Sequence, residues 1–263
     1  MPYKTSLFAK EPPNHDARLW RYMDLQRFIS ILDRKELYFP SAATLSKCDP
    51  FEGEPALEKI YAASQKGQDE MRWLRLNADL FKHLNFFNCW HMNDGESDAM
   101  WKLYSNGNDG VAIQSTVTRI KSCFDQSESE VYMGMVNYDG RHTLELSDRT
   151  DVVITDYMLK RPAFKHEQEV RLGTYRSDVN DTYFERGTLK HQGLNISVDD
   201  ILLNPKTEGV NVGVDVEILI EKLFISPLSH GGFSDLVISI TKKLGYTFEV
   251  VPSDMSRNPP LSG

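Results

Sequence analysis

The spacing of apolar residues predicts a chain of short strands and helices. Segment 17–23 is predicted to be a strand, in which side chains alternate between two faces. Leu19 and Arg21 would lie on one face, and Trp20 and Tyr22 on the other. Asp24 then caps a helix whose apolar positions 25, 28, 29 and 32 recur at helical spacing. Further strands are predicted at 37–40, 85–92, 110–114, 131–138, 167–175, 189–196, 222–226 and 247–251. Helices are predicted at 54–83, with a break near Gly67, and at 97–104, 116–124, 151–160 and 233–244. Loops are predicted at 41–53 and 177–188.

The order of these elements predicts the fold class. Helices and strands interleave without a regular strand–helix–strand repeat, and no internal repeat or long linker interrupts them. We therefore expect an α+β fold with split, mostly antiparallel sheets flanked by helices. Residues 1–252 are predicted to form a single domain, and residues 253–263 a loose C-terminal tail rich in serine and proline.

Charge and composition narrow the functional classes. The chain of 263 residues has a net charge of −8, which argues against a broad nucleic-acid groove because phosphate binding needs clustered basic residues. A local basic patch is still predicted at Lys160, Arg161, Lys165 and His166. No apolar run approaches the ~20 residues of a membrane-spanning helix, and the first residues lead into no apolar signal segment. With three widely spaced cysteines, expected to be reduced, these features predict a cytoplasmic protein without a membrane partner.

The segment from Lys160 to Leu172 contains the strongest candidate site. Glu167, Glu169 and Arg171 alternate with Gln168, Val170 and Leu172. On a strand this spacing places the three charges on one face, roughly 6–7 Å apart, which suits the binding of one small substrate. The alternative is a solvated strand face with simple Glu–Arg pairs.

Two earlier segments supply polar candidates. Arg21 and Tyr22 lie among aromatic residues on the first strand, where Arg21 is either a ligand-binding group or a surface residue beside the core. Asp49 and Glu52 lie in the segment Asp-Pro-Phe-Glu-Gly, which either binds substrate or only shapes a turn.

An aromatic segment follows. Trp90 and His91 lie on the strand at 85–92, and Trp101 and Tyr104 share a helix face with Ser97 and Met100. Trp and Tyr on one face can line a pocket for a planar ring, although core packing explains the same pattern. The sequence contains no phosphate-binding loop, dinucleotide fingerprint or nucleophile elbow. Its histidines show no paired spacing, so a metal site is not expected.

In this order, the four segments resemble an uncharacterised bacterial family, domain of unknown function 2971. Members read as a tyrosine-containing first strand, an Asn-Asp-Pro-Phe-Glu loop, a Cys-Phe-Ser strand leading to Met-Trp and Tyr, a Gly-Val strand, and a Lys…Glu-x-Glu-x-Arg strand. The matching residues are Tyr22, the loop from Asp49 to Glu52, Cys89, Met100-Trp101 with Tyr104, Gly110-Val111, and Lys160 with Glu167, Glu169 and Arg171. Cys48 replaces the family's Asn, and Trp90-His91 replaces its Phe-Ser.

More distantly, the arrangement is similar to the ADP-ribosyltransferase superfamily. There, an Arg or His on the first strand holds NAD, a central strand packs on the nicotinamide ribose, and a late strand supplies a Glu. The resemblance implies an NAD-consuming enzyme, with toxin or phage-defence effector as the expected biological role. Glu169 would stabilise the ribosyl cation and Glu167 would orient or deprotonate the acceptor.

The same resemblance implies that NAD is a substrate. Arg21, Lys160 and Arg171 would bind its pyrophosphate, and Trp101 or Tyr104 would stack on nicotinamide. Tyr22, Trp90 and His91 complete the expected nucleotide site, and the acceptor would be a protein or a nucleic acid. Two other classes stay open: a non-catalytic module that binds a ligand or protein, and a nuclease that uses Asp49, Glu52, Glu167 and Glu169.

Overall fold

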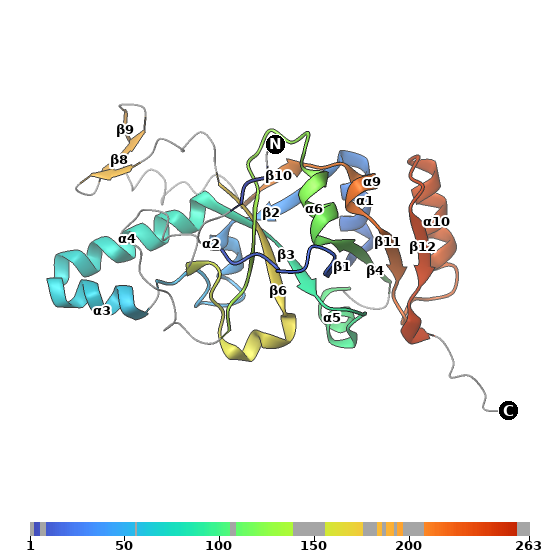
Figure 1. The fold of residues 1–263 in the computed structure, drawn as a ribbon, viewed down its shortest axis with the longest axis horizontal. Coiled ribbons are helices and arrows are strands. Elements are labelled where there is room, and N and C mark those ends of the chain that lie inside the picture. The colour runs from blue at the N-terminus through green and yellow to red at the C-terminus, as the bar shows by residue number, and fades with distance from the viewer. Residues whose placement is uncertain are drawn as a thin grey trace.

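The computed structural model describes residues 3–5, 9–55, 57–105, 109–138, 156–175, 183–185, 188–191, 194–196 and 208–256. Within these residues, seven strands form a central sheet (Figure 1). Their order is β12 (Glu249–Pro252), β11 (Lys222–Ile225), β4 (Gly110–Thr116), β1 (Arg18–Asp24), β3 (Asn85–Met92), β6 (Glu169–Tyr175) and β5 (Tyr132–Met135). The pair β11–β12 is parallel, and the other neighbours are antiparallel.

Two smaller sheets accompany the central one. An antiparallel pair consists of β2 (Glu36–Pro40) and β10 (Gly209–Gly213). A second group consists of β7 (Tyr183–Glu185), β8 (Thr188–His191) and β9 (Leu194–Ile196). The prediction of one strand at 189–196 is therefore wrong, because the chain folds back between β8 and β9. The prediction of a loop at 177–188 is wrong at Tyr183–Glu185, which form β7, and most of its other residues lie outside the described residues.

Helices flank the sheet, which confirms the predicted α+β class with split, mostly antiparallel sheets. They are α1 (Leu25–Arg34), α2 (Ala42–Leu45), α3 (Leu57–Lys66), α4 (Gln68–Leu84), α5 (Asp98–Tyr104), α6 (Val117–Cys123), α9 (Val216–Leu219), α10 (Phe233–Lys243) and the 3₁₀ segments η1 (Pro162–Glu167) and η3 (Asp254–Ser256). The short α2 was not expected within the loop at 41–53. The helix predicted at 151–160 lies outside the described residues up to 155, and the chain from Asp156 to Lys160 is not a continuous helix.

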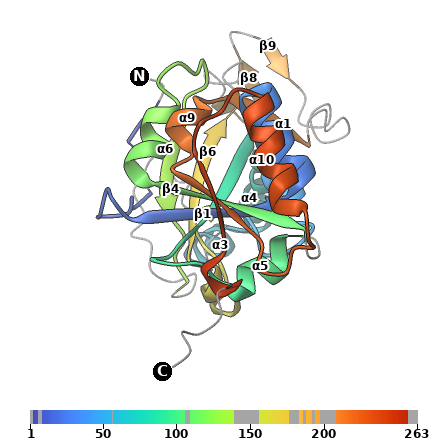
Figure 2. The ribbon, with the colours of Figure 1, turned by 90° about the vertical axis from the view of Figure 1, so that its right-hand side faces the viewer.

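The two faces of the sheet have different cores. One face buries the large cluster formed by α1, α6, α9, α10 and the β2–β10 pair with residues such as Leu19, Trp90 and Val170. The other face packs Trp20 and Tyr22 against α5, which lies on the side of the molecule away from α6 and α9 (Figures 1 and 2). The candidate site lies on this second face.

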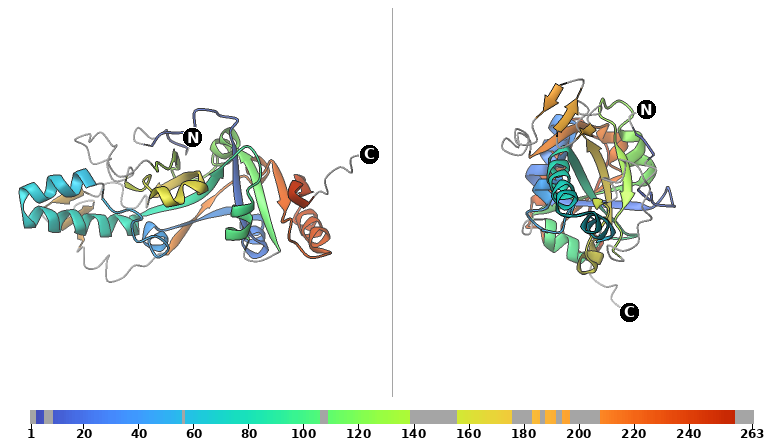
Figure 3. Two further views of the ribbon diagram at one scale, coloured as in Figure 1. Left: turned by 90° about the horizontal axis from the view of Figure 1, so that it is seen from below. Right: turned by 90° about the vertical axis from the view of Figure 1, so that its left-hand side faces the viewer.

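Two local features shape the periphery. Gly67, with φ of 112°, separates α3 from α4, so the predicted break in the helix is confirmed, and the two helices project together beyond the sheet (Figure 3). The first residues of the predicted C-terminal tail are packed: Ser253 is buried, and its Oγ donates to Glu96 over 2.5 Å. Within the described chain, none of the helices combines the length and the apolar character needed to span a bilayer.

Candidate functional site

Strands β1, β3 and β6 are neighbours in the sheet, and their predicted site residues form a row. Trp20 pairs with His91, and His91 pairs with Glu169. Residues paired across antiparallel strands point to the same face of the sheet. The first strand, the central strand and the late glutamate strand are therefore adjacent, although about 70 residues separate each from the next along the chain. The sheet order thus assembles the segments that the sequence only suggested.

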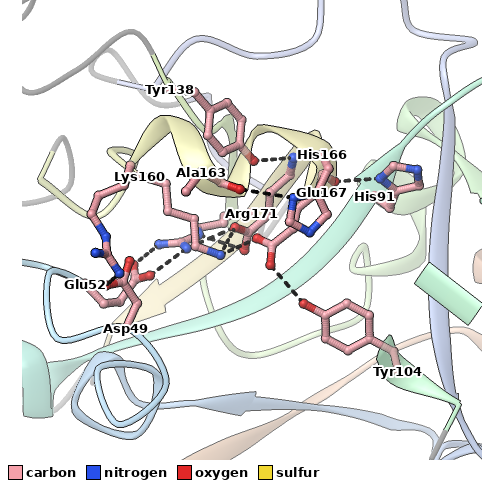
Figure 4. A network of polar contacts seen from close by, with 12 residues as sticks. Asp49, Glu52, His91, Tyr104, Tyr138, Lys160, Ala163, His166, Glu167 and Arg171 are labelled. Carbon is pink, nitrogen blue, oxygen red and sulfur yellow. Dashed lines mark hydrogen bonds and ion pairs between the residues drawn. The ribbon is translucent and has the colours of Figure 1, made fainter. Parts of the chain in front are cut away.

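Arg171 is the centre of a buried ion-pair network (Figure 4). Its Nε donates to Glu169 Oε1 at 2.9 Å and its Nη2 donates to Glu169 Oε2 at 3.1 Å. Its Nη1 and Nη2 also donate to the two carboxylate oxygens of Glu52, and Nη1 reaches the carbonyl of Tyr157 at 2.5 Å. The side chains of Arg171, Glu52 and Glu169 are 1%, 3% and 5% exposed. The alternative of a solvated strand face is therefore wrong in its exposure, although its Glu–Arg pairing is confirmed.

The loop that carries Glu52 reaches Arg171 through a close approach of backbone to ring. Gly53 follows Glu52 with φ of 67°, and a Cβ there would lie 2.3 Å from the ring of Tyr157. Only glycine fits this position, because it adopts the left-handed conformation without a side chain. The loop thus forms the turn expected from its sequence, and the same turn brings Glu52 to Arg171.

Lys160 extends the network to Glu167 and Tyr104. Its Nζ donates to Glu167 Oε2 and, at 3.1 Å, to Glu169 Oε2. The Tyr104 hydroxyl donates to Glu167 Oε1 at 3.1 Å, and Tyr104 is 39% exposed. The structure therefore brings together both predicted catalytic carboxylates, with a solvent-exposed aromatic residue beside Glu167.

Glu167 reaches this position by a route that the sequence did not show. It is the last residue of η1, and Gln168 adopts a left-handed conformation with φ of 40° before β6 begins. The prediction that Glu167 and Glu169 share one strand face is wrong. A non-glycine residue rarely takes positive φ, and nothing in the spacing of the charges indicates such a turn.

The surrounding charges fix the ionisation of Glu169. Burial raises the pKa of this carboxyl, but Arg171 and Lys160 outweigh burial and lower the pKa from 4.5 to about 2. Burial likewise lowers the pKa of Lys160, and its glutamate partners raise the pKa above its ordinary range. The network therefore holds Glu169 as a carboxylate at any physiological pH.

This pKa shift predicts acid sensitivity. Because the pKa of Glu169 is lower in the folded protein than in the unfolded chain, its stabilisation is complete above pH 4.5 and is lost as pH falls toward 2. The shift corresponds to about 3 kcal/mol, of which about 2 kcal/mol is lost by about pH 3. Urea unfolding at pH 6 and at pH 3 measures this loss, and Glu169→Gln should show a smaller difference between the two pH values. An equal difference in the variant would contradict the assignment.

Arg21 lies next to the network. After the pair Trp20–His91, no further β1–β3 pairing occurs, and Arg21 Nη1 donates to the carbonyl of Cys89 at 2.6 Å. Burial lowers the pKa of the guanidinium to about 10, while Cys89, Tyr104 and Glu169 act in the opposite direction. Arg21 is thus held by the backbone of β3, and Glu169 is the weakest of the charges that act on its pKa.

The aromatic candidates divide between the two faces. Tyr22 packs edge-on against Trp101, with ring centroids 4.9 Å apart, and lies 6.3 Å from the ring of His91. Trp90 pairs with Val170 in the core of the opposite face, and its indole N–H donates to Asn88. The structure therefore does not bring Trp90 together with Glu169.

His91 and Trp101 each leave a buried polar atom without a partner. His91 Nδ1 lies 2.6 Å from the carbonyl of Glu167, so Nδ1 carries the proton and Nε2 carries a lone pair. Burial lowers the pKa of His91, which favours this neutral form. Among the described residues, neither His91 Nε2 nor the indole N–H of Trp101 has a hydrogen-bond partner. Such atoms cost stability unless a ligand or water satisfies them.

Asp49 lies at the edge of the network and faces a different cation. Its Oδ1 accepts from Arg161 Nη2 at 2.8 Å and from the backbone N–H of Phe51 at 3.1 Å. Of the two acidic residues predicted to bind substrate, Glu52 is therefore paired with Arg171, and Asp49 with Arg161. Among the described residues, no group of three or more His, Cys, Asp or Glu side chains has an arrangement suited to a metal ion.

Three contributors were not predicted as site residues. The Tyr138 hydroxyl accepts the backbone N–H of Glu169, the carbonyl of Tyr157 accepts from Arg171, and Cys89 helps to lower the pKa of Glu169. Cys89 is among the residues that match the family pattern, and it lies two residues before His91. The two tyrosines lie in segments predicted as a strand and a helix, but nothing in the sequence indicated a part in the site.

Comparison with known proteins supports part of the resemblance. Residues 100–172 match the model of a family described as Protein of unknown function (DUF2971). The chain is thus similar to that family over a segment that contains Trp101, Tyr104, Lys160, Glu167, Glu169 and Arg171. Searches of curated proteins and of solved structures gave no match.

Proposed function

We propose that the protein is an NAD-consuming enzyme of the ADP-ribosyltransferase type. The observation that carries the proposal is the row formed by Trp20, His91 and Glu169 across β1, β3 and β6. These are the three strands from which the proposed relatives build their nucleotide site. The two unpartnered atoms near Tyr22 support the same substrate class.

The nicotinamide carboxamide matches the unpartnered pair in chemistry. Its NH₂ group is a donor for His91 Nε2, and its oxygen is an acceptor for the indole N–H of Trp101. Both rings lie beside Tyr22, so the two unpartnered groups belong to one aromatic cluster. The neighbouring Arg21 would face the negatively charged pyrophosphate.

In the proposed reaction the bond between ribose C1′ and the nicotinamide nitrogen breaks, and its electron pair leaves with nicotinamide. Positive charge develops on the ribose, and the Glu169 carboxylate stabilises it. Water or an acceptor hydroxyl then bonds to C1′ and gives up its proton toward Glu167. The proton is finally released to solvent, so ADP-ribose or an ADP-ribosylated acceptor results.

The Glu169 carboxylate is held in place for this role, but most of its hydrogen-bond acceptor positions are already occupied. A carboxylate has about four lone-pair positions, of which Arg171 and Lys160 fill three. One lone-pair position is left, and a ribose hydroxyl could donate a hydrogen bond to it. The fixed carboxylate would then need no reorganisation when charge develops.

Incubation with NAD tests the proposal directly. Free nicotinamide is followed in the presence and absence of a cell lysate that supplies acceptors. Release of many nicotinamide molecules per protein molecule is the expected result. A folded protein that leaves NAD intact under both conditions would refute the enzymatic proposal.

Tyr104 supplies a milder prediction. Tyr104→Phe removes the hydroxyl that donates to Glu167 and keeps the ring. A hydrogen bond to a charged group contributes about 1.5–3 kcal/mol, so nicotinamide release should slow about tenfold or more. The same bond also stabilises the folded state, because its acceptor Glu167 is buried, so the rate is compared on protein shown to be folded. An unchanged rate would show that the hydrogen bond from Tyr104 to Glu167 takes no part in the mechanism.

The hydrogen bonds that already occupy most of the Glu169 carboxylate favour a second candidate function. This is a non-catalytic module that binds a ligand or a protein. In that case the network only rigidifies the fold around a binding surface, and ligands bind without turnover. The nuclease hypothesis receives less support, because Arg171 and Lys160 already neutralise the carboxylates that would hold Mg²⁺.

A further inference from the structure

Tyr104 carries a nucleophilic group at the boundary between solvent and the buried network. It is the last residue of α5 and is 39% exposed, whereas Glu167 is 8% exposed. Its hydroxyl points to this glutamate and donates to Oε1 at 3.1 Å (Figure 4). A hydroxyl on a residue that a ligand can reach from solvent is therefore hydrogen-bonded to a buried carboxylate.

Lys160 connects this carboxylate to Glu169. Its ammonium donates to Oε2 of Glu167 and, at 3.1 Å, to Oε2 of Glu169. Acceptor atoms that share one donor lie within roughly 6 Å of each other. Because Tyr104 uses the other oxygen of Glu167, the hydroxyl and both predicted catalytic carboxylates belong to one site.

The hydroxyl of Tyr104 needs a base in order to act as a nucleophile. Partial burial and the charge of Glu167 raise the pKa of Tyr104, so the hydroxyl keeps its proton at physiological pH. A hydroxyl is activated when a base lies within hydrogen-bond reach, at about 2.6–3.2 Å. The distance of 3.1 Å to Glu167 Oε1 meets this condition. Bond formation to a cationic carbon makes the hydroxyl proton strongly acidic, and this carboxylate can then accept it.

We propose that Tyr104 is an internal acceptor, to which the protein attaches one ADP-ribosyl group; this rests on the proposed function. The bond between ribose C1′ and the nicotinamide nitrogen breaks, and its electron pair leaves with nicotinamide. The Tyr104 oxygen bonds to C1′, and its proton passes to Glu167 and then to solvent. Tyr104 thus faces the ribose, not the nicotinamide ring. Water and external acceptors compete for C1′, so several nicotinamide molecules are released for each tyrosine that is modified.

Mass spectrometry of the purified protein after incubation with NAD tests the proposal, with nicotinamide measured in the same sample. The wild-type protein should gain one ADP-ribosyl group, located by peptide mapping at Tyr104. Tyr104→Phe should gain none, even when incubated until it has released as much nicotinamide as the wild type. The matched control is Tyr61→Phe, which alters a tyrosine of α3 that is 68% exposed and should be labelled as the wild type is. The label should resist neutral hydroxylamine, which cleaves an ester at Glu167 but not a bond to a tyrosine oxygen.

Three results would overturn this proposal and leave the proposed function intact. These are nicotinamide release without a gain in protein mass, a label that persists in Tyr104→Phe at equal release, and a label that hydroxylamine removes. Transfer within one molecule is tested by mixing the wild-type protein with Glu169→Gln, whose Tyr104 should stay unlabelled. Labelling of that variant would contradict an internal acceptor. Absence of nicotinamide release by folded protein would overturn both proposals together.

Discussion

Arg171→Met is expected to destabilise the protein by about 3–5 kcal/mol, the usual cost of breaking a buried ion pair from one side. The variant leaves Glu52 buried without its cation and removes two of the donors to Glu169. It also leaves the carbonyl of Tyr157 without this donor. Urea unfolding at neutral pH measures the effect as a lower midpoint.

The matched control for this variant is Arg27→Met. Arg27 makes the same type of pair, with Asp24, but its side chain is 71% exposed. Exposed pairs contribute little, so the control should lie within about 1 kcal/mol of the wild-type protein. If Arg171→Met and Arg27→Met had the same stability, the network would not be the structural centre described above.

Glu169→Gln should lower nicotinamide release by about 10²–10³-fold, the effect of removing one preorganised electrostatic group from a transition state. The amide keeps the size of the side chain but carries no charge to stabilise the ribosyl cation. It also presents an N–H₂ group toward Arg171 or Lys160, so some stability is lost. For this reason the rate is measured on protein shown to be folded, at a temperature well below its unfolding transition.

The sequence predicted most of the helices and strands, because the patterns that indicate them involve residues close together along the chain. Strand β3 was predicted from its aromatic residues, and the helices α1, α5 and α10 from helical spacing and capping residues. Register across strands is different. The sequence suggested Trp90 and His91 together, but adjacent residues of a strand face opposite sides, and only pairing with β6 shows that His91 accompanies Glu169.

The candidate site was only partly predictable for a similar reason. The sequence indicated Glu167, Glu169 and Arg171, but burial depends on what covers a strand. Glu52 reaches Arg171 from a loop 119 residues earlier, and no local pattern reports such a contact. Gln168 adopts a left-handed conformation between η1 and β6, and neither composition nor spacing predicts it.

Side-by-side rates of nicotinamide release from NAD test the central claim most directly. The three proteins are the wild type, Glu169→Gln and Glu54→Gln, a control that removes a carboxylate from buried Lys82 outside the row. The account predicts release by the wild type and by Glu54→Gln, and a loss of about 10²–10³-fold in Glu169→Gln. Equal rates for Glu169→Gln and the wild type, or no release by folded wild-type protein with any acceptor, would contradict it.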